Sequence, residues 1–441
     1  MGVAVLLARL PAVSVGRSFV HRLRFEFAFV LIVGVVLPTL LALSLNTDAL
    51  RAGLHLAKRL PLQSYDAITN SFVGAFACAI ATLLVLRKFR QYPGVAIAAS
   101  ILPVLASFYA GFLGLVIVLR LEYSNSILAF SFFSTLIARY AIETLWRGNG
   151  LVFCVVPGGK VDRIRKLTRV PVLDLQEPLL EALPRGPIIA DLHADLAPEW
   201  ERLIAEAAIS GRPVYHYRQV WETETGRVQI NHLSENGFGA LVPSLVYQKL
   251  KRSVDLVASI LVLPLVLPLM AVTALLIKLD SRGSIFFLQR RMGFRGKVFN
   301  VVKFRTMTEA NDGEDREKSV TQTDDQRVTK IGRFLRRTRL DELPQIVNIV
   351  RGEMSWIGPR PEAVSLSAWY ESEIPFYRYR HIVRPGITGW AQVNQGHVAS
   401  LDEIDNKLQF DFYYIKHLSY WLDIVIALRT LRVILSGFGA K

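Results

Sequence analysis

The sequence has very little cysteine and no recognisable cysteine motif. Only two of its 441 residues are cysteines, Cys78 and Cys154, and neither belongs to a Cys-x-x-Cys pair or to a Cys/His cluster. This argues against a disulfide framework and against a zinc site. Because Cys78 lies in an apolar run and Cys154 in a strand-like run, both are predicted to be buried thiols.

The N-terminus lacks a secretion signal. Several arginines within residues 9–24 precede the first long apolar run, and there is no convincing small-residue cleavage site. A signal peptide is therefore not predicted, and the chain is expected to begin in the cytoplasm.

The composition favours a membrane protein. Hydrophobic residues make up 51% of the chain, the formal net charge is +15, and the mean hydropathy is +0.32. Apolar content this high argues against disorder. The basic excess lies beside long apolar runs, which is typical of proteins at a membrane with an anionic inner surface. Membrane lipids, and not nucleic acid, are therefore the expected partners.

Four apolar runs in the first part of the chain lack a charged residue at their centres. They lie near residues 26–46, 71–86, 95–119 and 126–142. Each is close to the ~20 residues that cross a hydrocarbon core, so residues 1–147 are predicted to form a four-helix transmembrane bundle. Basic residues after the second and fourth runs place both ends of the bundle in the cytoplasm, whereas Arg51, Lys58 and Arg59 oppose this orientation. Because charges inside spans mark transport paths, an anchor is favoured over a transporter.

Residues 148–243 predict a Rossmann-like α/β module. Buried-strand patterns at LVFCVVP, RGPIIADL and RPVYHYRQV accompany an amphipathic-helix pattern at APEWERLIAEAAISG, which is typical of a small parallel sheet. Gly158 and Gly159 follow the first strand, but the full Gly-x-Gly-x-x-Gly pattern of dinucleotide sites is absent, and a tight turn explains them equally well. Regulation or formation of a homodimer is the expected role.

Residues 244–441 open with a different apolar segment. No charge occurs from Leu256 to Ile277, which is long enough to span, but Pro264 and Pro268 favour a bend in mid-run. Basic residues flank both ends, and a span would carry one basic flank across the membrane. A re-entrant helix over about 252–278 is therefore predicted. The alternative, a fifth span, would place about 160 C-terminal residues on the opposite side.

A cation-rich stretch with one acidic pair follows. The alternation in VFNVVKFRTM predicts a strand with Lys303 and Arg305 on one face. Farther on, many arginines surround Asp341 and Glu342. Helix capping would explain the pair taken alone, because Asp favours the N-cap and Pro344 suits a first helical turn. Beside so many cations, the pair is also suited to hold a phosphate and Mg²⁺, and a carboxylate can act as a nucleophile toward phosphorus.

Four stretches carry a resemblance to a known family. They are KRSVD, VFNVVKFRTM, TKIGRFLRRTRLDELPQIVNIVRGEMSWIGPRPE, and VRPGITGWAQVN followed by DFYYIKHLSYWLDI. From about residue 247 to the C-terminus, the sequence resembles the bacterial sugar transferases, which are monotopic phosphoglycosyl transferases. The layout of the whole chain is similar to that of the large galactose- or glucose-phosphate transferases of this family. The resemblance implies an α/β catalytic domain on a re-entrant membrane helix.

The resemblance also implies roles for individual residues. Asp341 matches the family's nucleophile, and Glu342 matches the acid that helps to hold Mg²⁺. Lys303 and Arg360 match residues that handle the diphosphate. Arg305, Arg339 and Arg384 are also expected to contact phosphate. One departure is that Leu267–Pro268 stands at the membrane bend where members often have Ser-Pro.

The implied reaction consists of two phosphoryl transfers. Asp341 attacks the sugar-bearing phosphorus of a UDP-hexose and UMP leaves, and the phosphate of polyprenyl (undecaprenyl) phosphate then attacks the covalent intermediate. UDP-sugars are cytoplasmic, so the catalytic domain is expected on the cytoplasmic face of the bacterial inner membrane. The product would initiate an exopolysaccharide, capsule or O-antigen. A non-enzymatic scaffold or regulator of polysaccharide export is the alternative from another class.

Overall fold

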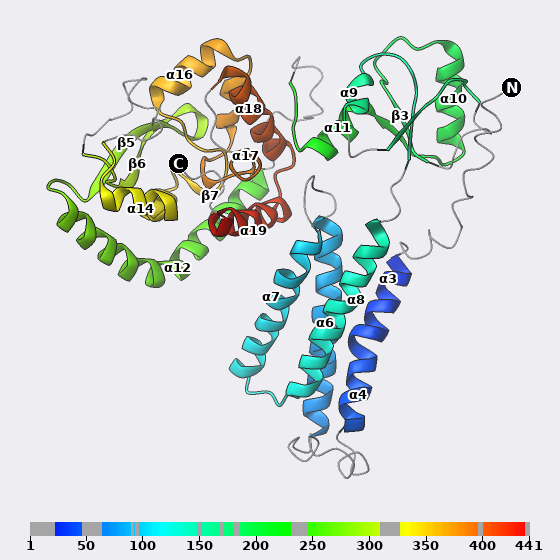
Figure 1. Cartoon of the computed structure of the whole chain (residues 1–441), viewed down its shortest axis with the longest axis horizontal. Helices are drawn as coiled ribbons and strands as arrows, with labels where there is room; N and C mark the ends of the chain where they lie inside the picture. Colours follow the sequence, from blue (N-terminus) through cyan, green and yellow to red (C-terminus); the bar gives the residue numbers. More distant parts are fainter. Residues whose placement is uncertain are drawn as a thin grey trace. The chain divides into compact units, whose positions relative to one another are not determined.

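The chain forms two compact units in the computed structural model, Met1–Glu224 and Thr225–Lys441 (Figure 1). The structure describes residues 23–45, 64–89, 92, 97–147, 152–167, 171–179, 186–230, 243, 245–308, 327–395 and 400–436. The arginine-rich N-terminus and the basic residues Arg51, Lys58 and Arg59 lie outside these ranges.

Apolar helices occupy the predicted runs of the first unit. They are α3 (Leu23–Leu31), the π-helix η1 (Ile32–Val36), α4 (Leu37–Leu45), α6 (Tyr65–Phe89), α7 (Ile97–Val118) and α8 (Asn125–Arg147). Figure 1 shows α3/α4, α6, α7 and α8 side by side, and a shared apolar core that includes Val35, Leu83, Leu105 and Ile142 joins them. Five helices in the described part of the chain are long and apolar enough to cross a membrane, and four of them are in this unit.

The π-helix η1 marks a close approach between two of these helices. The Gly34 carbonyl accepts hydrogen bonds from the hydroxyls of Ser131 (2.5 Å) and Thr135 (3.2 Å) on α8. A Cβ atom at Gly34 would lie 2.5 Å from the Thr135 hydroxyl oxygen, so only glycine fits here. The α8 side chains give this carbonyl hydrogen-bond partners outside its own helix, at the place where the α-helical pattern is interrupted.

The rest of the first unit is a parallel α/β module, as the sequence predicts. Its strands are β1 (Phe153–Val155), β2 (Val172–Asp174), β3 (Ile188–Ala190) and β4 (Val214–His216), and its helices are α9 (Asp162–Arg165), α10 (Pro198–Ile209) and α11 (Tyr217–Thr225). All pairings are parallel, in the order β2-β1-β3-β4. Alternate residues of β1 face opposite sides: Cys154 packs with α10, and Val155 packs with α9 and α11. Both predicted buried thiols are confirmed.

The paired glycines after β1 form a tight turn around a carboxylate. Gly158 and Gly159 have φ values of 120° and 62°, which favour glycine. The Lys160 N–H donates to Oδ2 of Asp191 (3.0 Å), and a Cβ at Gly159 would lie 2.4 Å from the same oxygen. The Asp191 carboxylate thus accepts a backbone N–H of this turn, and its negative charge disfavours a phosphate there. The structure favours the turn interpretation of these glycines over nucleotide binding.

The longest helix of the second unit is α12 (Leu245–Asp280), a single helix that contains Pro264 and Pro268. Figure 1 shows that this helix is bent. Its N-terminal part is tied to the unit where Arg252 donates to the carbonyls of Ile349 and Val350. Near its C-terminal end, Ile277 belongs to a buried cluster of the same unit. The middle of α12 is exposed and apolar.

The remaining elements of the second unit build a mixed α/β fold. They are β5 (Phe286–Met292), η5 (Phe294–Gly296), β6 (Val298–Phe304), α14 (Lys330–Thr338), η6 (Leu340–Gln345), α15 (Ile346–Arg351), β7 (Ser355–Ile357), α16 (Val364–Glu373), η7 (Tyr377–Ile382), β8 (Gly386–Thr388), α17 (Trp390–Asn394), α18 (Leu401–Lys416) and α19 (Tyr420–Ser436). Strands β5 and β6 form an antiparallel hairpin, and β7 pairs with β8 in parallel.

The boundary between the units differs from the sequence prediction, which placed residues up to 243 in the middle module. Val228 N–H donates to the Gln409 carbonyl (2.9 Å), and Trp390 Nε1 donates to the Gly226 carbonyl (2.9 Å). These contacts tie residues 226–228 to the second unit because they satisfy backbone groups that would otherwise be buried without partners.

Candidate active site

The acidic pair sits at a sharp reversal of the chain. Arg339 adopts a left-handed conformation (φ 60°) at the end of α14, and the short 3-10 helix η6 begins directly after it. Asp341 and Glu342 therefore lie in the first turn of η6, and Arg339 holds the N-cap position. Asp341 is not the helix N-cap, so capping does not account for its side chain.

Three cations converge on one oxygen of Glu342. Oε1 lies 3.1 Å from Arg360 Nη1, 3.4 Å from Lys303 Nζ and 3.8 Å from Arg339 Nη1. Lys303 comes from β6, and Arg360 comes from the loop after β7. These are three of the five predicted phosphate-handling residues.

Asp341 differs from its neighbour because it is buried without a hydrogen bond at one oxygen. Only 8% of the residue is exposed, and Oδ1 has no hydrogen-bond partner among the residues that the structure describes. A buried oxygen of this kind loses its hydration without compensation. This oxygen therefore keeps its hydrogen-bonding capacity for a ligand or a reacting atom, although neighbouring atoms cover it in this structure.

Burial and charge act differently on the two carboxyl groups. Burial raises the pKa of Asp341; Lys303 opposes this shift, and the negative charge of Glu342 adds to it. Burial would also raise the pKa of Glu342, but Arg360, Lys303 and Arg339 outweigh it and lower that pKa to about 2. Glu342 therefore remains an anion, whereas Asp341 is the more basic of the two carboxylates.

A second buried charge cluster supports the loop that carries Arg360. Arg380 donates to the Arg360 carbonyl (2.9 Å) and forms an ion pair with Asp411 (2.8 Å). Arg291 donates to the next carbonyl, that of Pro361. With two successive carbonyls held, the loop fixes the direction of the Arg360 side chain toward Glu342.

The sequence did not single out this supporting cluster. Its acids, Glu362 and Asp411, are far apart along the chain, and each finds a basic partner only in the fold: Lys407 and Arg380, respectively. Asp411 is a single acid within the aromatic run FDFYY. Because a charge in an apolar run is rarely buried without a partner, this position could have indicated a buried ion pair.

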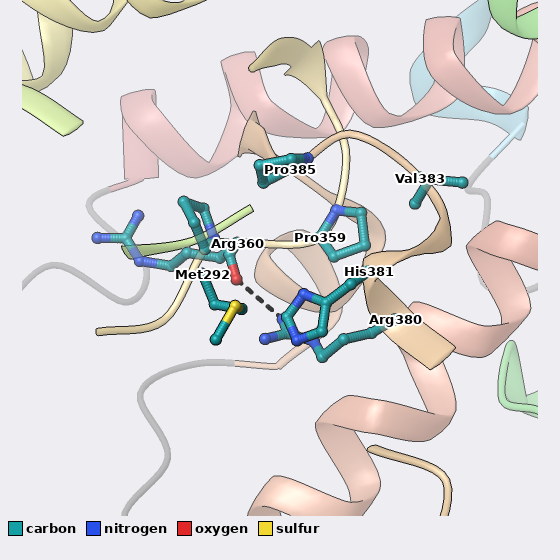
Figure 2. Close-up of a pocket in the computed structure, with 8 residues that line it drawn as sticks. Met292, Pro359, Arg360, Arg380, His381, Val383 and Pro385 are labelled. Carbon is teal, nitrogen blue, oxygen red and sulfur yellow. Dashed lines mark hydrogen bonds between the residues drawn. The ribbon is translucent and has the colours of Figure 1, made fainter. Parts of the chain in front are cut away.

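A small pocket adjoins the Arg360 loop. Figure 2 shows its lining, with the Arg380 guanidinium directed at the Arg360 carbonyl. The lining residues are Met292, Pro359, Arg360, Pro361, Arg380, His381, Val383 and Pro385. The pocket has apolar side chains beside two arginines, one of which, Arg360, contacts Glu342.

His381 predicts a dependence of stability on pH. Burial, followed by the charges of Arg380 and Arg378, lowers its pKa from 6.5 to about 3. The unfolded chain therefore binds a proton between these values and the folded chain does not, so stability falls as the pH falls below about 6.5. From pH 7.5 to pH 5.5, wild type is expected to lose about 1.4 kcal/mol more unfolding free energy than His381→Gln. Denaturant unfolding of both proteins in detergent measures this; equal losses would contradict it.

The structure directs Arg305 and Arg384 away from the acidic pair. Arg305 donates to the carbonyls of Ser281 (2.8 Å) and Arg282 (3.0 Å), because β6 ends at Phe304 and the strand alternation stops there. Arg384 donates to the Gly352 carbonyl (3.1 Å) and stacks on a phenylalanine ring. Neither is gathered with the three cations that contact Glu342.

Comparison with known proteins now decides the family. Residues 246–437 match the model of the bacterial sugar transferase family. A UDP-N-acetylgalactosamine-undecaprenyl-phosphate N-acetylgalactosaminephosphotransferase from Aeromonas hydrophila is 42% identical over 380 residues, which cover 86% of this chain and 89% of the relative. The chain belongs to the bacterial sugar transferases. This confirms the resemblance found in the sequence.

Two further relatives align with this chain over stretches about as long as the family domain. The UDP-glucose:undecaprenyl-phosphate glucose-1-phosphate transferase of Escherichia coli (strain K12) is 45% identical over 200 residues, 44% of this sugar transferase and 42% of the relative. An enzyme with the same description from Caulobacter vibrioides is 40% identical over 204 residues, 46% of this chain and 76% of its own. The Aeromonas relative therefore resembles this chain well beyond the domain shared by the others.

Proposed function

We propose that this sugar transferase moves a sugar phosphate from a UDP-sugar to undecaprenyl phosphate through a covalent intermediate on Asp341. The observation that carries the proposal is the buried Oδ1 of Asp341, which has no hydrogen-bond partner in the described part of the chain. It lies beside Glu342, whose charge three cations neutralise. Phosphoryl transfer depends chiefly on positioning and on neutralising charge, and this arrangement supplies both.

In the first step, a carboxylate oxygen of Asp341 forms a bond to the sugar-bearing phosphorus. The bond from that phosphorus to the UMP oxygen breaks, and UMP leaves with the electron pair. Lys303 and Arg360, which contact Glu342 without substrate, would neutralise the diphosphate oxygens. The raised pKa of Asp341 makes its ionised carboxylate a stronger nucleophile.

In the second step, a phosphate oxygen of undecaprenyl phosphate attacks the same phosphorus. The bond to the Asp341 oxygen breaks, which regenerates the free carboxylate and yields a polyprenyl diphosphate sugar. Because the acyl phosphate bond is exchanged for the phosphoanhydride bond of the product, no oxidant or further co-substrate is needed.

The residues present fit Mg²⁺. Two adjacent buried carboxylates supply hard oxygen ligands. Among the described residues, one oxygen of Asp341 has no hydrogen-bond partner, and the cation contacts of Glu342 all go to Oε1. We assign Glu342 as the protein's Mg²⁺ ligand. When bound, the ion would offset the negative charge of the diphosphate.

The donor is best sought with a panel of UDP-sugars. The Aeromonas relative is named for N-acetylgalactosamine and others for glucose, so UDP-N-acetylgalactosamine and the UDP-hexoses come first. Purified protein, undecaprenyl phosphate and Mg²⁺ are expected to release UMP with at least one donor. Absence of UMP with every donor would instead favour a non-enzymatic scaffold for polysaccharide export.

We also propose that α12 enters the membrane and returns to the same side. Both parts of the helix contact one folded unit: Arg252 near its start and Ile277 near its end. Between them, Ile260, Leu261 and Leu265 are 67–78% exposed, an apolar surface that the hydrocarbon core of a bilayer would cover. This arrangement would hold the site at headgroup depth on the cytoplasmic face, where both the lipid phosphate and UDP-sugars are available.

A re-entrant α12 predicts that its two flanks are labelled from the same side. In a chain with Cys78 and Cys154 replaced by Ala, single cysteines at the exposed positions Lys249 and Arg282 should react with an impermeant maleimide only after the inner membrane is opened. A cysteine at Glu122, in the α7–α8 connection, is the control expected to react in intact spheroplasts. Reaction of Lys249Cys and Arg282Cys from opposite sides would establish a fifth span.

A further inference from the structure

Three side chains with metal-binding atoms meet in the α/β module, outside the candidate active site. Asp191 follows β3, His193 lies two residues later, and His216 ends β4. His193 Nδ1 is 2.8 Å from His216 Nε2, which is 3.4 Å from Asp191 Oδ1. All three ligand atoms lie within 4.8 Å of one another. They meet because β3 and β4 are parallel neighbours, so their carboxyl ends share one edge of the sheet.

Asp191 is held in a fixed orientation by the glycine turn after β1. Its Oδ2 accepts the Lys160 N–H (3.0 Å), while Oδ1 faces His216 and accepts the His193 N–H (3.2 Å). Gly159 has a positive φ, and any side chain there would collide with this carboxylate. The turn is thus built around Asp191 and directs one of its oxygens at the two imidazoles, as supporting contacts do around metal ligands.

We propose that Asp191, His193 and His216 form a site for a divalent transition metal, with Zn²⁺ as the reference ion. Imidazole nitrogens and a carboxylate oxygen are ligands that Zn²⁺ prefers. Asp191 is buried, His216 half-buried and His193 exposed, so the cluster is open to solvent on the His193 side. Three protein ligands with one open side leave a coordination position for water or a small ligand.

The sequence argued against zinc because it lacks cysteine motifs. This cluster uses no cysteine, and its second histidine is 23 residues beyond the first. No linear spacing rule covers such a set, since only the sheet brings its members together.

The protons on His216 set a condition for binding. Arg218 N–H donates to His216 Nδ1 (3.0 Å), so the metal-free ring carries its proton on Nε2, directed toward His193 Nδ1. A metal ion at Nε2 takes the place of that proton, which moves to Nδ1, and the Arg218 N–H then needs another acceptor. Arg218 lies in the first turn of α11, where N–H groups have no partner within the helix and water can replace the ring.

Metal titration of the full-length protein tests the site directly. The chain is purified in detergent with a histidine-free tag, stripped with EDTA, and titrated with Zn²⁺ against a chromophoric chelator while excess Mg²⁺ fills the carboxylate site. One Zn²⁺ per chain is expected, and Co²⁺ in its place should give visible absorption bands. Single changes His193→Ala and His216→Ala should each weaken Zn²⁺ binding at least about 10-fold.

The matched control is Asp195→Asn, which removes an exposed carboxylate from the same loop and should leave Zn²⁺ affinity unchanged. If His216→Ala fails to fold, His193→Ala decides the test alone, because His193 is exposed and outside the core. Zn²⁺ binding that persists in His193→Ala, or the absence of a stoichiometric Zn²⁺ in wild type, would overturn the proposal and leave a hydrogen-bonded Asp-His-His cluster.

Discussion

Asp341→Asn is expected to lower the rate of UMP release by at least about 10³-fold. Asn has the same shape as Asp but an amide that cannot form an acyl phosphate. The amide NH₂ of Asn can take the place of Oδ1, which is buried and has no hydrogen-bond partner among the described residues, so the fold is expected to stay intact. Initial rates of UMP formation from the preferred UDP-sugar, with undecaprenyl phosphate and Mg²⁺, measure the loss.

The control is Asp402→Asn, an exposed carboxylate in the first turn of α18. It should retain the wild-type rate and an unchanged melting temperature. If Asp341→Asn kept more than about a tenth of the wild-type rate, a role as nucleophile could not be maintained, since loss of a nucleophile costs far more than that.

Arg360→Met is expected to lower kcat/KM by about 10² to 10³-fold, the usual loss when one preorganised donor to a developing charge is removed. Arg360 is 3.1 Å from Glu342, and its loop is held by Arg380. Methionine keeps the unbranched apolar stem of the side chain and removes the guanidinium charge. The same kinetic assay, run over a range of UDP-sugar concentrations, separates the loss into kcat and KM.

Arg305→Met is the matched comparison, because sequence reasoning groups Arg305 with Arg360 whereas the fold separates them. Arg305 binds carbonyls at the end of α12, so its loss should lower the melting temperature but reduce kcat/KM by less than about 10-fold. Equal losses in the two variants would contradict the site geometry and support the grouping made from the sequence.

The sequence was most informative where local pattern and chemistry coincide. The apolar runs fall on long helices, the alternating segments form a parallel sheet, and Lys303 and Arg360 meet Glu342. In each case the periodicity of the segment, or its likeness to the family, is enough to predict the helix, strand or site residue. Knowledge of contacts between distant residues is not needed.

The contacts that the sequence does not predict have a common physical cause. Arg305 departs from Lys303 because β6 ends one residue too soon for the alternation to continue. Asp411 and Arg380 are 31 residues apart, and only the fold makes them a buried ion pair. Asp191 and His216 likewise meet only because β3 and β4 are neighbours. Contacts between distant residues depend on where elements end and pack, which no single segment encodes.

The central claim is that Asp341 carries the sugar phosphate between donor and acceptor. The most direct measurement is mass spectrometry of protein quenched after incubation with the preferred UDP-sugar and Mg²⁺ in the absence of undecaprenyl phosphate. We expect one sugar phosphate on the peptide containing Asp341, absent from Asp341→Asn and discharged when undecaprenyl phosphate is added before the quench. An active enzyme with an unmodified Asp341 peptide, or an adduct on another residue, would contradict it.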